Sequence, residues 1–189
     1  MKPLFILAIS AFLLAGCGQF SMVPAGSNVI QGLSFTSTSD WNKSPSAPTS
    51  NSEVWTKDGL ALNELLFIYE VEDGASLFRQ SSNELPMPSY RSSMLPNEIE
   101  ELVKTSLINA MGGEIPISTS NLRPMPIEDI IGFRFEFDFY TTEGLAIRGD
   151  VLAIPDNELL NVIIYKAASM HYYEKDLEEV NAIFESIRL

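Results

Sequence analysis

The fold is decided by the stretch Phe133-Arg134-Phe135-Glu136-Phe137-Asp138-Phe139-Tyr140 of this 189-residue chain. Aromatic and polar side chains alternate through it without a break, so its period is two residues. In an extended strand this period places the four phenylalanine rings on one face and the polar side chains on the other. The stretch therefore predicts a β-strand that covers one side of a hydrophobic core. We interpret the rings as core residues and not as a cofactor-binding motif.

Two further strands are expected after this stretch. Residues 142–144 predict a turn, and residues 145–154 predict a returning strand in which Gly149 indicates a bulge or a close approach. A second turn at 155–158 leads to a strand over 159–167 that is apolar on both faces. Such a pattern is typical of a central strand that is covered on both sides. The three strands together predict an antiparallel meander.

The remaining elements are predicted from periodicity and from turn-forming residues. Residues 60–71 are apolar on both faces and predict a second central strand. Shorter strands are expected at 33–38 and 115–122. Apolar residues at helical spacing predict helices at 96–111 and 173–187. Segments rich in Pro or Ser predict loops, and these cover 43–53, 81–96 and 123–129.

Helices combined with an antiparallel sheet define an α+β fold. Because two strands are apolar on both faces, we expect a sheet of about six strands with helices packed on both faces, a three-layer sandwich. Residues 28–189 are expected to form a single domain, with a mobile loop near 43–53.

Residues 1–16 have the organisation of an export signal. Lys2 supplies a positive charge, and residues 3–14 form an apolar run that is shorter than the ~20 residues of a membrane-spanning helix. The sequence Leu14-Ala15-Gly16-Cys17 follows, and it resembles the lipobox of bacterial lipoproteins. The alternative is an ordinary signal peptide with a chance cysteine.

The lipobox resemblance implies cleavage before Cys17 and attachment of acyl chains to this residue. Several acyl chains hold a protein on a membrane much more firmly than one chain does. Residues 17–27 are then a lipidated cysteine and a short tether. Gly18 stands where an aspartate would resemble an inner-membrane retention signal, which favours the outer membrane. We therefore predict a lipid-anchored envelope protein that faces the periplasm.

Charge and cysteine content narrow the classes of function. The chain has 25 acidic and 12 basic residues and a formal net charge of −13. Such a chain should not bind nucleic acid or anionic lipid through its general field. Cys17 is the single cysteine, so no intramolecular disulfide is possible.

The sequence also resembles the PsbP/DcrB-like α/β/α sandwich domains and a group of uncharacterised proteobacterial lipoproteins. The residues that carry this resemblance are Gly132-Phe133-Arg134-Phe135, Gly144, Gly149, Tyr165-Lys166-Ala167, Ser186-Ile187, Leu33-Ser34-Phe35, Trp41 and Trp55-Thr56-Lys57-Asp58-Gly59. These are structural glycines and apolar positions. The resemblance therefore implies a fold and a location but no activity, because folds of this kind host varied binding and assembly roles.

Residues that could carry chemistry are few. His171 is the single histidine, no Gly-x-Ser-x-Gly motif is present, and a zinc site is not expected. If His171 acted as a base, an acid such as Glu136 or Asp150 would have to reach it through the fold. No cofactor or metal is expected. The candidate surface for a ligand or partner consists of Trp55, Asp58, His171 and Tyr172.

The sequence favours a non-catalytic binding or assembly module of the bacterial envelope, with an envelope protein or a small ligand as its partner. Two alternatives remain open. One is an envelope hydrolase that uses carboxylates or His171, which an apolar cleft holding a carboxylate of raised pKa would favour. The other is a carrier of a hydrophobic ligand, which would need a sizeable cavity.

Overall fold

The structure is a computed structural model that describes residues 19–80 and 83–189. The predicted export signal, the lipobox and Cys17 lie outside the described residues. The elements follow the order β1 (Ser21–Val23), β2 (Gly26–Ile30), β3 (Leu33–Ser37), β4 (Trp41–Lys43), β5 (Ser52–Thr56), β6 (Asn63–Val71), α2 (Pro96–Ala110), β7 (Ser118–Ile127), β8 (Ile130–Tyr140), β9 (Ala146–Asp156), β10 (Leu159–Ala168) and α3 (Tyr172–Ser186).

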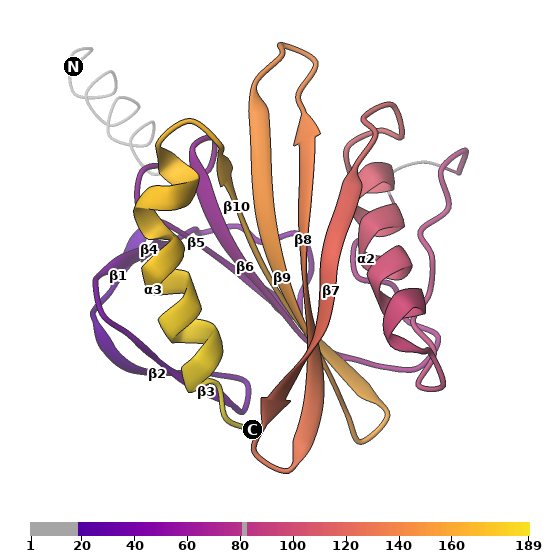
Figure 1. Ribbon diagram of the computed structural model, residues 1–189, viewed down its shortest axis with the longest axis horizontal. Helices are drawn as coiled ribbons and strands as arrows, with labels where there is room; N and C mark the ends of the chain where they lie inside the picture. Colours follow the sequence, from indigo (N-terminus) through magenta and orange to yellow (C-terminus); the bar gives the residue numbers. More distant parts are fainter. Residues whose placement is uncertain (1–18, 81–82) are drawn as a thin grey trace, which may run out of the picture.

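The described residues form one large sheet of eight strands in the order β1-β4-β5-β6-β10-β9-β8-β7 (Figure 1). Every neighbouring pair is antiparallel. The predicted meander is confirmed as β8-β9-β10, and β7 extends it. The middle of the sheet is the pair β6 and β10, whose side chains are buried on both faces. The α+β class and the two predicted central strands are therefore confirmed.

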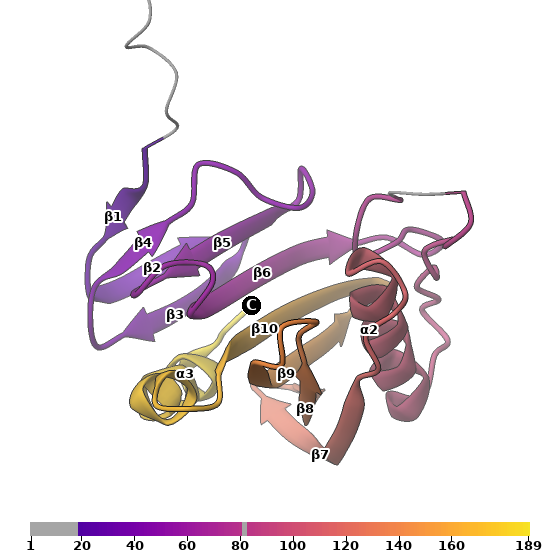
Figure 2. The same ribbon diagram turned by 90° about the horizontal axis from the view of Figure 1, so that it is seen from above.

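The two faces of the sheet carry separate cores. One core lies under α3 and the two-stranded hairpin β2–β3. The other lies under α2, which packs against β7, and under the irregular segment that precedes α2. Figure 2 shows α3 and α2 far apart, at the two sides of the sheet. The expected sandwich of six strands between helical layers is wrong, because the sheet has eight strands and each face is covered partly by non-helical chain.

Two local predictions also differ from the structure. Residues 123–129 were expected to be a loop because of Pro124 and Pro126, but residues 123–127 continue β7, and only residues 128–129 form the turn to β8. A strand at the edge of a sheet tolerates proline, because its outer N–H groups need no partner. Part of the segment 17–27 that was predicted to be a tether is β-strand, because β1 begins at Ser21 and pairs with β4, and β2 begins at Gly26.

Candidate binding cleft

One row of side chains across the sheet defines the candidate site. Glu64 of β6 lies opposite Lys166 of β10, Lys166 lies opposite Gly149 of β9, and Gly149 lies opposite Phe137 of β8. Directly paired residues share a face of the sheet. The row lies on the face that α2 covers, because Phe137 belongs to the core beneath α2.

Gly149 makes room for an aromatic ring in this row. A Cβ atom at this position would lie 2.1 Å from Cζ of Phe137 and 2.7 Å from the carbonyl oxygen of Tyr165. The pairing of β9 with both neighbours passes through Gly149 without a register shift. Of the two expectations for Gly149, the close approach is therefore confirmed. The ring of Phe137 lies across the β9 backbone and forms part of the floor of the site.

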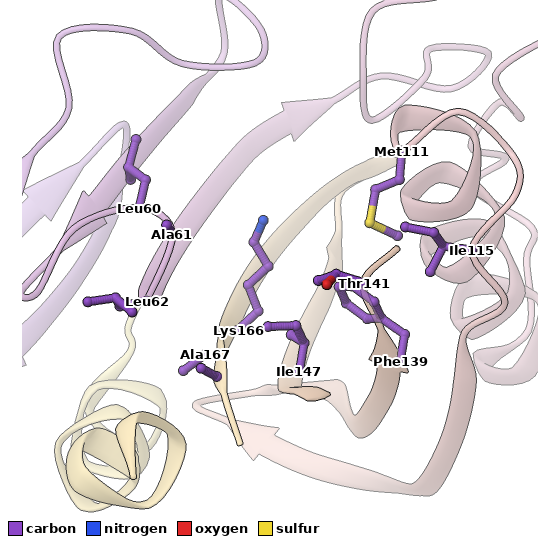
Figure 3. Close-up of a pocket in the computed structure, with 11 residues that line it drawn as sticks. Leu60, Ala61, Leu62, Met111, Ile115, Phe139, Thr141, Ile147, Lys166 and Ala167 are labelled. Atoms are coloured by element: carbon purple, nitrogen blue, oxygen red, sulfur yellow. The ribbon is translucent and has the colours of Figure 1, made fainter. Parts of the chain in front are cut away.

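Next to this row the α2 face is hollow. Two hollows, with volumes of about 230 and 260 Å³, share Met111, Phe139 and Lys166 as lining residues. We call the two together the α2 cleft. Its other lining residues are Leu60, Ala61, Leu62, Ile115, Thr141, Ile147, Ala167 and Ala168 in the outer hollow, and Pro48, Glu64, Leu66, Phe78, Leu107, Ala110, Ile117, Phe137 and Ile164 in the inner hollow. Figure 3 shows the outer hollow between the turn at Leu60–Leu62 and the end of α2.

A single ion pair interrupts the apolar lining of the α2 cleft. Nζ of Lys166 lies 3.2 Å from Oε2 of Glu64, and both side chains are partly exposed. In Figure 3 the Lys166 side chain rises from β10 into the space between Leu60 and Met111. A concave apolar site with a few polar groups is typical of ligand binding. The arrangement can therefore hold an apolar group and place one polar contact near the entrance.

The structure gives the hydrolase alternative no support. The carboxyl pKa shifts at Asp73, Glu143 and Glu179 are all downward, which is the opposite of what a general acid needs. Glu136 accepts a hydrogen bond from Asn121, 2.7 Å away, and Asp150 is paired with Arg134. Neither acid orients His171. Among the described residues no group of His, Cys, Asp and Glu could hold a metal ion.

The predicted surface residues divide into two groups. Trp55 is 2 % exposed, and its ring packs against Phe35 and Phe67. It is therefore a core residue and cannot offer an open platform to a ligand. Asp58, His171 and Tyr172 lie at the start of α3, and none of them lines the α2 cleft.

Asp58 and Tyr172 are brought together by one lysine. Nζ of Lys175 lies 2.7 Å from both carboxylate oxygens of Asp58 and 5.9 Å from the centre of the Tyr172 ring. Hydrogen bonds to Asp58 raise the pKa of Lys175. His171 precedes α3 with a φ of 78° and packs edge-on against Tyr172. These contacts fix the start of α3, and they leave the ring of His171 without a catalytic partner among the described residues.

The residues of the α2 cleft were not among the predicted site residues. Its walls come from several connecting segments, the end of α2 and four strands, which lie far apart in the sequence. One signal was present in the sequence: Lys166 is the one charged residue of β10, a strand that is mostly apolar on both faces. A charge at such a position indicates either a buried ion pair or an opening in the core.

Comparison with known proteins supports the fold. No family model and no curated protein matches the sequence. Among solved structures, the cyanobacterial PsbP of Synechocystis sp. PCC 6803 superposes with a TM-score of 0.60 and 8 % identity, over 93 % of this chain and 95 % of that one. A protein from Bacteroides thetaiotaomicron VPI-5482 gives a TM-score of 0.51 and 10 % identity. The match covers 87 % of this chain but 48 % of that protein.

A third structure is more distant. LpqN of Mycobacterium tuberculosis, which is described as involved in cell envelope biogenesis, gives a TM-score of 0.35 and 8 % identity over 93 % of this chain and 86 % of that one. At identities this low only a likeness of fold follows, and it follows from the first two structures. The chain has a PsbP-like fold.

Proposed function

We propose that this chain is a lipid-anchored protein of the bacterial envelope that acts as a non-catalytic binding module, and that it binds an apolar ligand in the α2 cleft. The observation that carries the proposal is the cleft itself, which is lined by apolar side chains and has one ion pair, Lys166 with Glu64. Burial of apolar ligand surface against such a lining is favourable.

The anchor part of the proposal rests on the sequence Leu14-Ala15-Gly16-Cys17 and on the resemblance to proteobacterial lipoproteins. Within residues 19–80 and 83–189, no helix is both long and apolar enough to cross a membrane. Three residues lie between Cys17 and the start of β1 at Ser21, and the four steps from Cys17 to Ser21 reach at most about 14 Å. The domain is then held close to the bilayer, and Gly18 favours the outer membrane.

The binding site is tested by filling it. Ala110 is exposed at the end of α2 and lines the inner hollow, so Ala110→Trp should occupy the hollow without disturbing the core. We expect this variant to fail to complement a deletion strain at matched protein level and unchanged melting temperature. Ala25→Trp, at an exposed position between β1 and β2, is the matched control and should complement.

His171→Gln separates the binding module from a hydrolase. The binding module predicts full complementation by this variant, because His171 contributes only to the start of α3. The opposite result would be loss of function by His171→Gln and full function of Ala110→Trp, both at unchanged melting temperature. It would place the functional site beside α3 and not in the α2 cleft.

The anchor is tested independently. Cys17→Ala should leave the protein unlipidated and its signal uncleaved. Incorporation of radiolabelled palmitate and the mass of the mature protein report the two outcomes. Label that persists in the variant would end the lipoprotein proposal, whatever the cleft binds.

A further inference from the structure

The α2 cleft opens at one end of the sheet. The outer hollow is lined by Leu60 from the connection between β5 and β6, by Thr141 from the connection between β8 and β9, and by Ala168 at the end of β10. The register confirms that these lie at one end, because Ala168 pairs with Ile147 and Ala167 pairs with Asn63. Figure 1 shows the three connections together at the top of the view.

The start of the described chain lies beside the same opening. Phe20 lines a shallow hollow together with Asn42, Lys57 and Gly59, and Gly59 directly precedes Leu60 in the wall of the cleft. The chain between Cys17 and Phe20 spans at most about 11 Å. A lipid on Cys17 would therefore hold the mouth of the α2 cleft, and not the opposite end of the sheet, against the bilayer.

Apolar side chains surround this mouth. Leu60 is 37 % exposed, Leu145 between β8 and β9 is 40 % exposed, and Met170 between β10 and α3 is 81 % exposed. The acidic character of the whole chain does not attract it to anionic lipid. Contact of this end with a bilayer is therefore apolar, and the anchor supplies the proximity.

We propose that the α2 cleft takes up one acyl chain of a phospholipid from the bilayer to which the protein is anchored. This inference rests on the proposed function and names its ligand class. The apolar walls contact the acyl chain, the ion pair of Lys166 with Glu64 lies beside it as the polar contact, and the head group stays at the membrane surface. The short chain from Cys17 to Phe20 restricts the source of the acyl chain to lipids that lie directly beneath the mouth.

Photocrosslinking tests this inference. The full-length lipidated protein is placed in vesicles of phosphatidylethanolamine and phosphatidylglycerol that contain a phospholipid with a diazirine on one acyl chain. We expect adducts of the mass of this phospholipid on the peptides that carry Met111, Phe139 and Ile147. Ala110→Trp should lower their yield by about tenfold, the change that follows when one of two apolar hollows is filled, and Ala25→Trp should not.

Each outcome has one meaning. The acyl-chain inference would be overturned if the adducts were confined to the residues around Phe20. Equal adduct yields in wild type and Ala110→Trp would overturn it as well. The same would follow if the protein's own anchor filled the cleft, because that anchor carries no diazirine and would exclude the probe. If adducts are absent and Ala110→Trp still fails in cells, the acyl-chain inference falls and the proposed binding site stands. If Ala110→Trp complements fully, the proposed site itself falls.

Discussion

The two faces of the sheet differ in the kind of side chain that they bury. The face under α3 contains charged groups that are paired. Arg134 of β8 forms a two-point ion pair with Asp150 of β9, which is 2 % exposed, and its guanidinium lies 5.0 Å from the ring centre of Phe184 in α3. Burial lowers the pKa of Arg134. The hydrogen bonds to Asp150 and the negative charge of Asp150 outweigh burial, so the net pKa of Arg134 is raised.

The α3 face has two more such contacts. Nζ of Lys57 lies 3.1 Å from Oδ1 of Asp176 in α3. Glu179, also in α3, accepts hydrogen bonds from the backbone N–H of Thr38 and from the indole N–H of Trp41. Each contact joins α3 to the chain beneath it. The α2 face is instead mostly apolar and hollow, and the ion pair of Lys166 with Glu64 lies in its cleft. Buried charge pairs cost desolvation energy and require one geometry, so these contacts fix the position of α3, whereas the proposed ligand site lies on the α2 face.

The largest expected effect comes from breaking the buried pair on the α3 face. Asp150→Leu leaves the Arg134 guanidinium buried without its counter-ion, which should lower the free energy of unfolding by ~3–5 kcal/mol. Denaturant unfolding measures the change. The double variant Arg134→Met with Asp150→Leu is the control and should recover most of the loss. A single variant that costs under about 1 kcal/mol would show that this pair does not fix the α3 face.

On the α2 face, the largest effect should come from the aromatic stripe of β8. Phe135 is buried and Phe133 is partly exposed. Phe135→Ala should cost about 3 kcal/mol through lost burial and a new cavity, and Phe133→Ala should cost clearly less. The same unfolding measurement applies. Equal costs would mean that the stripe does not form the floor of the core as described.

A smaller, pH-dependent effect should come from Glu179. Burial raises the pKa of its carboxyl group, but hydrogen bonds from Thr38 and Trp41 and the charge of Lys57 outweigh burial, and the net pKa is lowered. A lowered pKa in the folded state adds stability above the ordinary carboxyl pKa, and this stability is lost as the pH falls through the folded value. Glu179→Gln should therefore cost about 1–2 kcal/mol at pH 7.

The difference between wild type and Glu179→Gln should shrink as the pH is lowered below about 4. Melting temperatures of both proteins between pH 3 and pH 7 report it. A gap that stays constant over this range would show that the charge of Glu179 does not contribute, and that the side chain acts by shape alone.

The smallest effect should have the opposite sign. Ser106 of α2 is fully buried, and its hydroxyl has no hydrogen-bond partner in the described part of the chain. An unsatisfied buried hydroxyl costs free energy, so Ser106→Ala should raise the free energy of unfolding by about 1 kcal/mol. If Ser106→Ala destabilised the protein instead, the α2 face would depend on polar contacts as the α3 face does.

The sequence predicted elements whose pattern is local. The alternation at 133–140 and the double-sided apolar runs at 60–71 and 159–167 correctly predicted β8, β6 and β10, because one strand's periodicity reports directly which faces are covered. The sequence did not predict that β7 continues through Pro124 and Pro126, because edge position is a property of the whole sheet.

The candidate site was missed for a related reason. The α2 cleft depends on the juxtaposition of Leu60, Met111 and Phe139, and nothing in the sequence near any one of them indicates the other two. The residues that were predicted, Trp55 and His171, stood out by their rarity. A rare residue type is not by itself a sign of a binding site. In this fold Trp55 packs in the core and His171 lies at the start of α3.

The pairing of β6 with β10 has a consequence for how the protein is made. In this pair of central strands Leu66 lies opposite Ile164. Arg188, near the end of the chain, exchanges backbone hydrogen bonds with Ser34. The N-terminal half therefore lacks the neighbour that completes its sheet until the last strand has been synthesised. Contacts between such distant residues form slowly, so the sheet is completed late, after β10 and the segment around Arg188 have been made.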